Sequence, residues 1–182
     1  MRSIALVAAL SLAVMPVSAS AHLREGAQAP DFTARGALAG KPFRLNLKQQ
    51  LKRGPVVLYF FPKAFTQGCT LETRAFSEAE KDFKKAGAQV IGLSADDYPT
   101  LARFSVEECR NAFPVATATP ETIRAYDVKL KEGLELTNRT SYVIAPNGKI
   151  IYVHSEPAWQ DHVKNTLAAV QQWRASAKGK GR

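Results

Sequence analysis

The chain has 182 residues, a formal net charge of +9 at pH 7 and 46% hydrophobic residues. This length predicts one domain, and the basic residues are spread without interleaved aromatics, which favours a solvated basic surface over a nucleic-acid or membrane-binding face. The two cysteines, Cys69 and Cys109, are too few for a disulfide-built scaffold. They form no CxxC pair and no metal-ligand spacing, so the sequence predicts neither a metal site nor a cofactor.

The N-terminal residues 1–21 have the pattern of a secretory signal peptide, in which an apolar stretch and a small-residue cleavage site follow Arg2. The apolar stretch is much shorter than the ~20 residues that span a bilayer, which disfavours a membrane anchor. We therefore expect export to the periplasm or the medium. The mature domain would cover 22–174, and a flexible basic tail would cover 175–182.

Strands and helices alternate in the first half of the predicted domain. The apolar run 55–61, bounded by Gly54 and Pro62, is typical of a central strand covered on both faces. The next helix is expected to end at Gly87. In the helix after that, Val106 is expected to point toward the core together with the other apolar residues. In chain order the elements are an irregular segment (26–32), a short edge strand (41–47), the central strand (55–61), a helix (69–85), a buried strand (89–95) and a helix from Asp97 to about residue 110.

The second half predicts a hairpin between two helices. Thr119 is the expected N-cap of the first helix, and the turn at Asn147 and Gly148 joins the two hairpin strands. The elements are a short strand (113–117), a brief helix (119–126), the hairpin strands (140–145 and 149–154) and a final amphipathic helix (161–173). This order predicts an α/β fold of the thioredoxin-like arrangement, with helices flanking a central mixed β-sheet.

Cys69 is the residue at which the sequence most strongly indicates chemistry. A buried strand ends at Pro62, a short loop follows, and Cys69 falls in the first turn of the next helix. Free backbone N–H groups and the positive end of the helix dipole favour thiolate over thiol there. Thr66 precedes Cys69 by one turn and can donate to the sulfur or to a bound oxygen. Arg139, directly before the strand 140–145, is the candidate cation facing the helix start.

The spacing of Pro62, Thr66 and Cys69 matches the PxxxTxxC signature, and the chain resembles the peroxiredoxins of the AhpC/TSA type. The stretch YFFPKAFTQGCTLE and the segment 139–150 are similar to the bacterioferritin comigratory protein (PrxQ) subfamily, and the resemblance extends over about 26–170. It implies that Cys69 is the peroxidatic cysteine, that Pro62 shields it, that Thr66 binds the peroxide and that Arg139 polarises the site. The same resemblance favours a monomer.

The sequence departs from the subfamily at two positions. Many relatives have a resolving cysteine where this chain has Arg74, and a proline where it has Gln67. Some relatives place the resolving cysteine on the following helix, where Cys109 lies. The resemblance thus implies an antioxidant thiol peroxidase acting on hydrogen peroxide and organic hydroperoxides. Its cycle would pass through a Cys69 sulfenic acid and a disulfide with Cys109, which a thioredoxin-like dithiol reduces.

Several alternatives stay open at this point. Cys109 fits a resolving thiol, a core thiol of a one-cysteine enzyme, or half of a permanent disulfide with Cys69. Glu72 fits either a partner that orients Arg139 or a residue on the solvated helix face. A thiol–disulfide oxidoreductase would need a CxxC pair, and a non-catalytic binding protein of this fold, such as a copper carrier, would need two close cysteines and a histidine.

Overall fold

The computed structural model describes residues 22–179. The predicted signal peptide, residues 1–21, lies outside the described residues, as do residues 180–182 at the other end. Within the part that is described, no helix is both long enough and apolar enough to span a bilayer.

Seven strands form one mixed sheet in the order β2-β1-β5-β4-β3-β6-β7. β3, β4 and β5 run parallel, while β1, β2, β6 and β7 pair antiparallel with their neighbours. The predicted central mixed sheet is therefore confirmed, with the predicted edge strand at one end and the hairpin at the other. The strands are β1 (Thr33–Leu38), β2 (Lys41–Asn46), β3 (Val56–Phe60), β4 (Gln89–Ser94), β5 (Val115–Thr117), β6 (Thr140–Ile144) and β7 (Ile150–Ser155).

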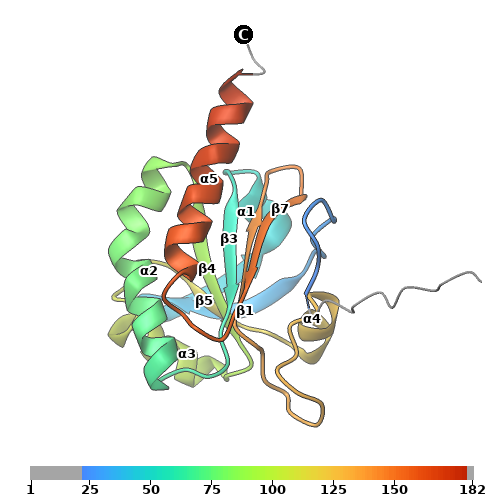
Figure 1. Cartoon of the computed structure of the whole chain (residues 1–182). Coiled ribbons are helices and arrows are strands. Elements are labelled where there is room, and N and C mark those ends of the chain that lie inside the picture. The colour runs from blue at the N-terminus through green and yellow to red at the C-terminus, as the bar shows by residue number, and fades with distance from the viewer. Residues whose placement is uncertain (1–21, 180–182) are drawn as a thin grey trace, which may run out of the picture.

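Helices cover both faces of the sheet (Figure 1). The helices are α1 (Leu47–Leu51), α2 (Gln67–Lys85), α3 (Tyr98–Glu107), α4 (Pro120–Ala125) and α5 (His162–Gly179). Buried residues of α1 and α4 belong to one core cluster, and those of α2, α3 and α5 belong to the other. α2 and α5 lie side by side over their face, with α4 on the opposite side of the sheet.

The central strand β3 supplies both cores because successive side chains of a strand point to opposite faces. Val56, Leu58 and Phe60 pack with α1 and α4, whereas Val57 and Tyr59 pack with α2, α3 and α5. All five residues of β3 are buried. A strand buried on both faces reads as an unbroken apolar run, which is why this element could be predicted with its boundaries nearly correct.

Two elements are missing from the prediction. The structure places β1 directly after the segment expected to be irregular, and a Cβ on Gly36 would lie 2.1 Å from the carbonyl oxygen of Val115 on β5. The glycine that weakens the strand pattern is thus needed for the close approach of β1 to β5. α1 is a single short helix with Asn46 as its N-cap, too short to show helical periodicity.

Two further predictions differ from the structure. Val106, expected to point inward from α3, is 44% exposed and lies on the solvent side of the helix. α5 runs on through Gly179, so the described part of the expected flexible tail is helical. Ala175 and Ala177 are strong helix formers, and a helix already anchored by packing extends through such residues at little cost.

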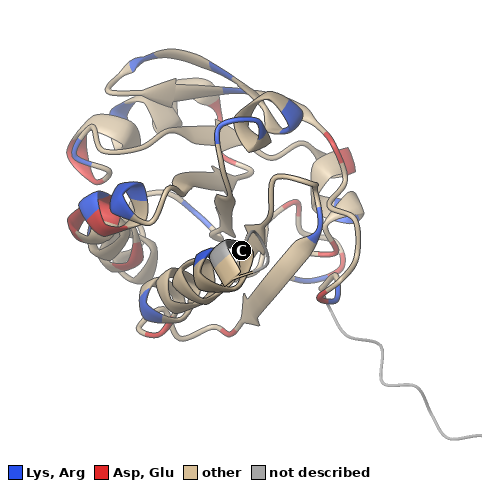
Figure 2. Ribbon diagram, turned by 90° about the horizontal axis from the view of Figure 1, so that it is seen from above, with Lys and Arg blue, Asp and Glu red and all other residues tan. Residues whose placement is uncertain are grey.

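The charged residues are dispersed over the fold (Figure 2). Lys and Arg lie on many separate elements and alternate with Asp and Glu. Four of the described ion pairs, such as Arg124 with Glu121, join residues three or four positions apart in one segment. This distribution agrees with the solvated basic surface expected from the sequence.

We predict that Gly92→Ala destabilises the fold by about 1–3 kcal/mol, the usual effect of overpacking a core. Gly92 pairs with Tyr59 across β3 and β4, and a Cβ there would lie 2.8 Å from the Tyr59 ring and hydroxyl. The control is Gly179→Ala, because a Cβ at that helical position meets nothing within 4 Å. Urea unfolding of both variants measures the effect. Equal midpoints for Gly92→Ala and the unmodified protein would contradict the prediction.

Candidate active site

The site forms where β3 ends and β6 begins. These strands are antiparallel neighbours, and Phe60 pairs with Thr140. Arg139, one residue before Thr140, therefore lies beside the chain that leaves β3 toward Cys69. The Thr137 hydroxyl donates to the Phe61 carbonyl at 2.7 Å and ties the two segments together. Sheet register thus brings together two residues that are 70 positions apart in the sequence.

The loop between β3 and α2 is fixed by side-chain hydrogen bonds. The Asp96 carboxylate accepts from the Ala64 backbone N–H at 2.7 Å and from the Ser94 hydroxyl at 2.8 Å. The Thr66 hydroxyl donates to the Lys63 carbonyl at 2.9 Å. The neighbouring Asp97 caps the helix α3. Asp96 instead holds the loop that carries Cys69.

Cys69 occupies the first turn of α2, which begins at Gln67, two residues earlier than predicted. Thr66 is the N-cap residue, but its side chain makes no capping hydrogen bond, because its hydroxyl is bonded within the loop. Backbone N–H groups of the first turn have no acceptor within a helix. Cys69 itself is only 1% exposed, so its sulfur lies at the positive end of the helix in a desolvated position.

Arg139 contacts three different groups with its guanidinium. Nη2 donates to Cys69 Sγ at 3.6 Å, Nη1 is ion-paired with Glu72 Oε2, and Nε donates to the Pro157 carbonyl at 2.9 Å. The Arg139 side chain is only 8% exposed, so water screens these contacts weakly. A planar fork with five donors can serve three acceptors at once, which a lysine ammonium cannot do in the same plane.

Gly68 makes room for that guanidinium. A Cβ at this position would lie 3.2 Å from Arg139 Nη2, closer than such contacts usually are. The absence of a side chain lets the cation reach across the start of α2 to the neighbouring Cys69. The sequence pattern did not indicate this steric role of Gly68.

Glu72 lies one turn beyond Cys69 on the buried side of α2 and is fully buried. Burial raises the pKa of Glu72 to about 8, against the opposing effect of the charge and hydrogen bond of Arg139. Of the two alternatives for this residue, the structure therefore supports the one that orients Arg139. A solvated position on the helix face is excluded.

His162 is a member of the site that the sequence analysis missed. It is the first residue of α5, it is fully buried, and its Nδ1 lies 2.8 Å from the Ser141 hydroxyl and 3.6 Å from Glu72 Oε1. Nε2 lies 3.0 Å from the Glu156 carbonyl oxygen. Burial lowers the pKa of His162 to about 4, so the ring is neutral near pH 7. No local pattern points to this residue, because it reaches the site only through packing of α5.

Pro62 and Thr66 lie in the loop that leads from β3 to Cys69. Pro62 is half-buried between β3 and the loop, and Thr66 is exposed. Because the Thr66 hydroxyl donates its proton to the Lys63 carbonyl, its oxygen lone pairs remain available as acceptors. The predicted donation from Thr66 to the sulfur is therefore not what the structure shows, and this hydroxyl can instead accept a proton from a bound hydroperoxide.

Cys109 is placed differently from Cys69. Both thiols are free and belong to the same core cluster, but Cys109 follows α3 in a turn that packs against the middle of α2. Its carbonyl accepts from the Ser77 hydroxyl at 2.7 Å, and Ser77 lies about 12 Å beyond Cys69 along the helix axis at 1.5 Å per residue. Burial raises the pKa of the Cys109 thiol well above its ordinary value, and nearby Glu108 adds to this.

These residues form a site for a nucleophilic sulfur. Cys69 has helix N–H groups and a guanidinium beside it, and both can stabilise negative charge on sulfur or on a departing oxygen. Over residues 22–179, no group of three or more His, Cys, Asp or Glu side chains is arranged to hold a metal ion.

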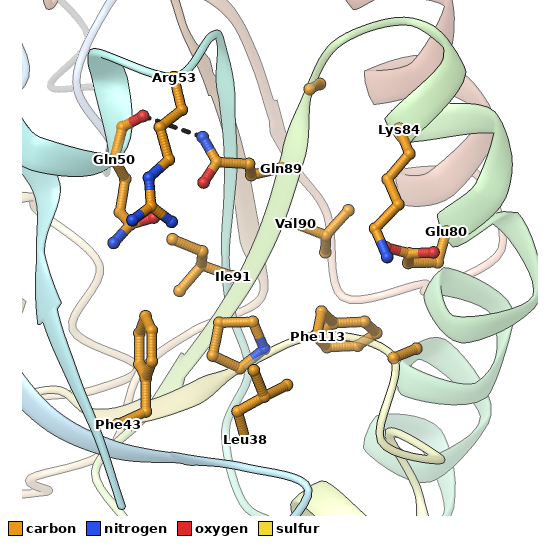
Figure 3. A pocket seen from close by; sticks show the side chains of 13 residues that line it. Leu38, Phe43, Gln50, Arg53, Glu80, Lys84, Gln89, Val90, Ile91 and Phe113 are labelled. Carbon is orange, nitrogen blue, oxygen red and sulfur yellow. Dashed lines mark hydrogen bonds and ion pairs between the residues drawn. The ribbon is translucent and has the colours of Figure 1, made fainter.

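A separate hollow of about 250 Å³ lies away from this site (Figure 3). Its lining includes Gln50 of α1, Val90 of β4 and Lys84 of α2, together with Arg53 and residues of β1, β2 and the segment before β5. Lys84 is roughly 22 Å from Cys69 along α2 at 1.5 Å per residue. None of the predicted site residues lines this hollow, so it is not part of the chemistry at Cys69.

Comparison with known proteins assigns a family to this arrangement. Residues 26–153 match the AhpC/TSA family. Peroxiredoxin Q, chloroplastic, of rice (Oryza sativa subsp. japonica) is 32% identical over 149 residues, which cover 81% of this chain and 66% of the rice protein. The chain thus spans just under two thirds of the length of that relative.

Solved structures lead to the same group of proteins. Peroxidoxin BcpB from Mycobacterium tuberculosis superposes with a TM-score of 0.73 and 31% identity, covering 83% of this chain and 98% of that one. The bacterioferritin comigratory protein of Xanthomonas campestris, studied for its alkyl peroxide reduction activity, gives a TM-score of 0.67 at 27% identity over 77% of this chain and 91% of its own. The predicted thioredoxin-like fold is confirmed by these neighbours.

We predict that Arg139→Lys slows alkylation of Cys69 by iodoacetamide at pH 6 roughly ten- to a hundredfold. The thiolate loses a hydrogen bond from a charged donor, a contact usually worth about 1.5–3 kcal/mol. The matched control is Arg74→Lys. Arg74 lies on α2, the helix that carries Cys69, but it pairs with Glu108 at 2.6 Å. An unchanged alkylation rate in Arg139→Lys would show that the guanidinium does not support the thiolate.

Proposed function

This chain belongs to the AhpC/TSA family, and we propose that it is a thiol peroxidase that reduces hydrogen peroxide and organic hydroperoxides through Cys69. The observation that carries the proposal is the contact of Arg139 Nη2 with Cys69 Sγ at the start of a helix. A cation and backbone N–H groups there face both the nucleophile and the space that a peroxide would enter. The absence of a CxxC pair argues against a thiol–disulfide oxidoreductase.

In the first step the Cys69 thiolate gives an electron pair to one peroxide oxygen. The S–O bond forms while the O–O bond breaks, and the second oxygen leaves as hydroxide or alkoxide and takes up a proton. Sulfur is oxidised to a sulfenic acid, and the peroxide is reduced to water or alcohol. Arg139 and the first-turn N–H groups stabilise the negative charge on the leaving oxygen.

The surroundings of Cys69 suit both small and organic hydroperoxides. Thr66 is exposed and presents acceptor lone pairs toward a peroxide O–H group. Phe65, in the loop that leads to Cys69, is a large apolar side chain that is 36% exposed. An alkyl group can therefore contact apolar surface close to the thiol. The Xanthomonas neighbour with its alkyl peroxide reduction activity supports this range of substrates.

In the second step we propose that Cys109 resolves the sulfenic acid. The Cys109 sulfur attacks the Cys69 sulfur, the S–S bond forms, and the S–O bond breaks with release of water that carries the Cys109 proton. An external thioredoxin-like dithiol then takes the disulfide back to two thiols. Because Cys109 is buried in a turn against the middle of α2, this step requires local opening of the turn and of the first turns of α2.

We also propose that the enzyme acts outside the cytoplasm as a monomer, after cleavage behind residue 21. The proposal on export depends on the sequence pattern of residues 1–21. The Leu23 backbone N–H donates to the Tyr142 hydroxyl at 3.1 Å, so this cleavage keeps a residue that packs against the domain. The N-terminal sequence and intact mass of protein from the exported fraction test it. A chain that still begins at Met1 would refute export with cleavage.

We predict that one equivalent of hydrogen peroxide, added to the reduced mature protein, yields a Cys69–Cys109 disulfide. Peptide mass spectrometry identifies the product on each cysteine. In Cys109→Ser we expect a sulfenic or sulfinic acid on Cys69, and in Cys69→Ser we expect no consumption of peroxide. If the protein without substitutions shows oxidised Cys69 but a free Cys109 thiol, the enzyme is a one-cysteine peroxidase. If peroxide does not oxidise Cys69 at all, the proposed peroxidase function is refuted.

We predict that Ser77→Ala accelerates disulfide formation after Cys69 has been oxidised. The Ser77 hydroxyl holds the Cys109 carbonyl, and loss of this hydrogen bond lowers the free energy of opening the turn by about 1 kcal/mol, or roughly fivefold in rate. Quenched-flow mass spectrometry measures the step, and Ser176→Ala near the C-terminal end of α5 is the control. An equal or slower rate in Ser77→Ala would mean that opening of this turn does not limit resolution.

A further inference from the structure

The Glu72 carboxyl group has one oxygen with a charged partner and one without any. Oε2 is paired with Arg139, whereas Oε1 is buried and, within the part of the chain described, has no hydrogen-bond partner. A buried carboxylate oxygen without a donor is strongly unfavourable. His162 Nδ1, on the neighbouring helix α5, lies 3.6 Å from Oε1. The protonation state of this histidine therefore affects which charge is favoured on the Glu72 carboxyl group.

The contacts of His162 assign its tautomer. Nε2 faces the Glu156 carbonyl oxygen at 3.0 Å, and a carbonyl can only accept, so Nε2 carries a hydrogen. A neutral ring then has a lone pair on Nδ1, which faces the Ser141 hydroxyl and Glu72 Oε1. Two acceptors, a lone pair and a carboxylate oxygen, would repel each other at this distance. The Nδ1 lone pair already accepts from the Ser141 hydroxyl at 2.8 Å, and a proton on Oε1 removes its repulsion with the carboxyl group.

We propose that Glu72 carries a proton on Oε1, beside the neutral ring of His162, and that this proton prevents Glu72 from neutralising the charge that Arg139 presents to the reacting atoms. The inference rests on the proposed peroxidase function for its catalytic consequence only. His162 acts as a positioning residue, because it contacts Glu72 and neither the thiol nor the peroxide. The raised pKa of Glu72 and the lowered pKa of His162 agree with a proton placed on the carboxyl.

Groups from every neighbouring element surround this proton. Arg139 precedes β6 and pairs with Oε2, and Cys69 lies on α2 one turn before Glu72. The buried hydroxyl of Tyr59 on β3 is close enough to Glu72 and Cys69 for their charges to affect it. His154 on β7 packs edge-on against His162, with ring centroids 4.4 Å apart, and Asp161 precedes His162. Arg139 is thus the cation that both Glu72 and Cys69 contact, so the charge on one affects the other.

The consequence is a fall in peroxide reduction at alkaline pH. Below about pH 8 Glu72 is protonated, and the full charge of Arg139 is available for the leaving oxygen. Above that pH Glu72 loses its proton, and its negative charge offsets that of Arg139. Reaction of Cys69 with a neutral alkylating reagent involves no leaving oxygen at Arg139, and we expect no fall in its rate over the same pH range.

Infrared spectroscopy tests the proton without any use of peroxide. At pH 7 the unmodified protein should show the C=O stretch of a protonated carboxyl that disappears above about pH 8 and is absent from Glu72→Gln. Glu121→Gln, an exposed position on α4, is the control and should keep the band. Nitrogen NMR of His162 should show the neutral ring with its hydrogen on Nε2. A band-free spectrum at pH 7, or a hydrogen on Nδ1 of a neutral ring, would overturn the proposal.

Kinetics then test the consequence. The second-order rate constant of Cys69 oxidation by hydrogen peroxide should fall above about pH 8 in the unmodified protein, and Glu72→Gln should remove that fall. In His162→Asn an amide can donate to Oε1 and stabilise the ionised carboxylate, so the fall should begin about one pH unit lower. His154→Asn, the same change in the adjacent ring, should leave the pH of the fall unchanged.

The outcomes separate this inference from the peroxidase proposal. If Cys69 does not react with peroxide at any pH, the proposed function fails, while the infrared band still decides where the proton lies. If Cys69 reacts but the rate does not fall at alkaline pH, or falls equally in Glu72→Gln, the effect of Glu72 on Arg139 is refuted. If His162→Asn lowers the rate uniformly without moving the profile, His162 has only a structural role.

Discussion

The buried contact between the Arg139 guanidinium and the Glu72 carboxyl group is the interaction on which the geometry of the site depends. Removing a charged group from water costs several kcal/mol, so the buried guanidinium is stable only when its donors have acceptors. Arg139 meets this condition through the Pro157 carbonyl and Cys69 Sγ. The thiol is therefore one of the acceptors that the buried guanidinium needs. A negative sulfur satisfies that need better than a neutral one, which links the stability of the site to the reactivity of Cys69.

The fold supplies this interaction through strand register and a helix start. β3 delivers the loop to Cys69, and its antiparallel neighbour β6 begins at the same edge of the sheet with Arg139 just before it. α5 then closes the site from the side, because its first residue, His162, packs against Glu72. The elements β3, β6 and α5 are not consecutive in the chain. The site exists only when the sheet and both helices α2 and α5 have assembled.

How well each part of the site could be predicted depends on how far apart in the sequence the residues that form it lie. The thiol at the helix start could be predicted because strand, loop and helix are consecutive, and Arg139 could be placed because it precedes a hairpin. Glu72 carried a local signal, since it lies one turn after Cys69 and one turn before the buried Phe76, on the apolar side of the helix. His162 carried none. β1 was missed because Gly36, required for contact with β5, weakens the strand pattern.

The two cysteines show how environment, more than residue type, assigns a role. Both are buried in the same cluster, yet Cys69 has a cation and helix N–H groups beside it, whereas Cys109 faces apolar side chains and the neighbouring charge of Glu108. A buried thiol whose pKa is raised is a poor nucleophile, so the folded state keeps Cys109 from reacting first. Its reaction with oxidised Cys69 must follow opening of the turn that Ser77 holds. The same packing that makes Cys69 the site of attack therefore makes resolution a conformational step.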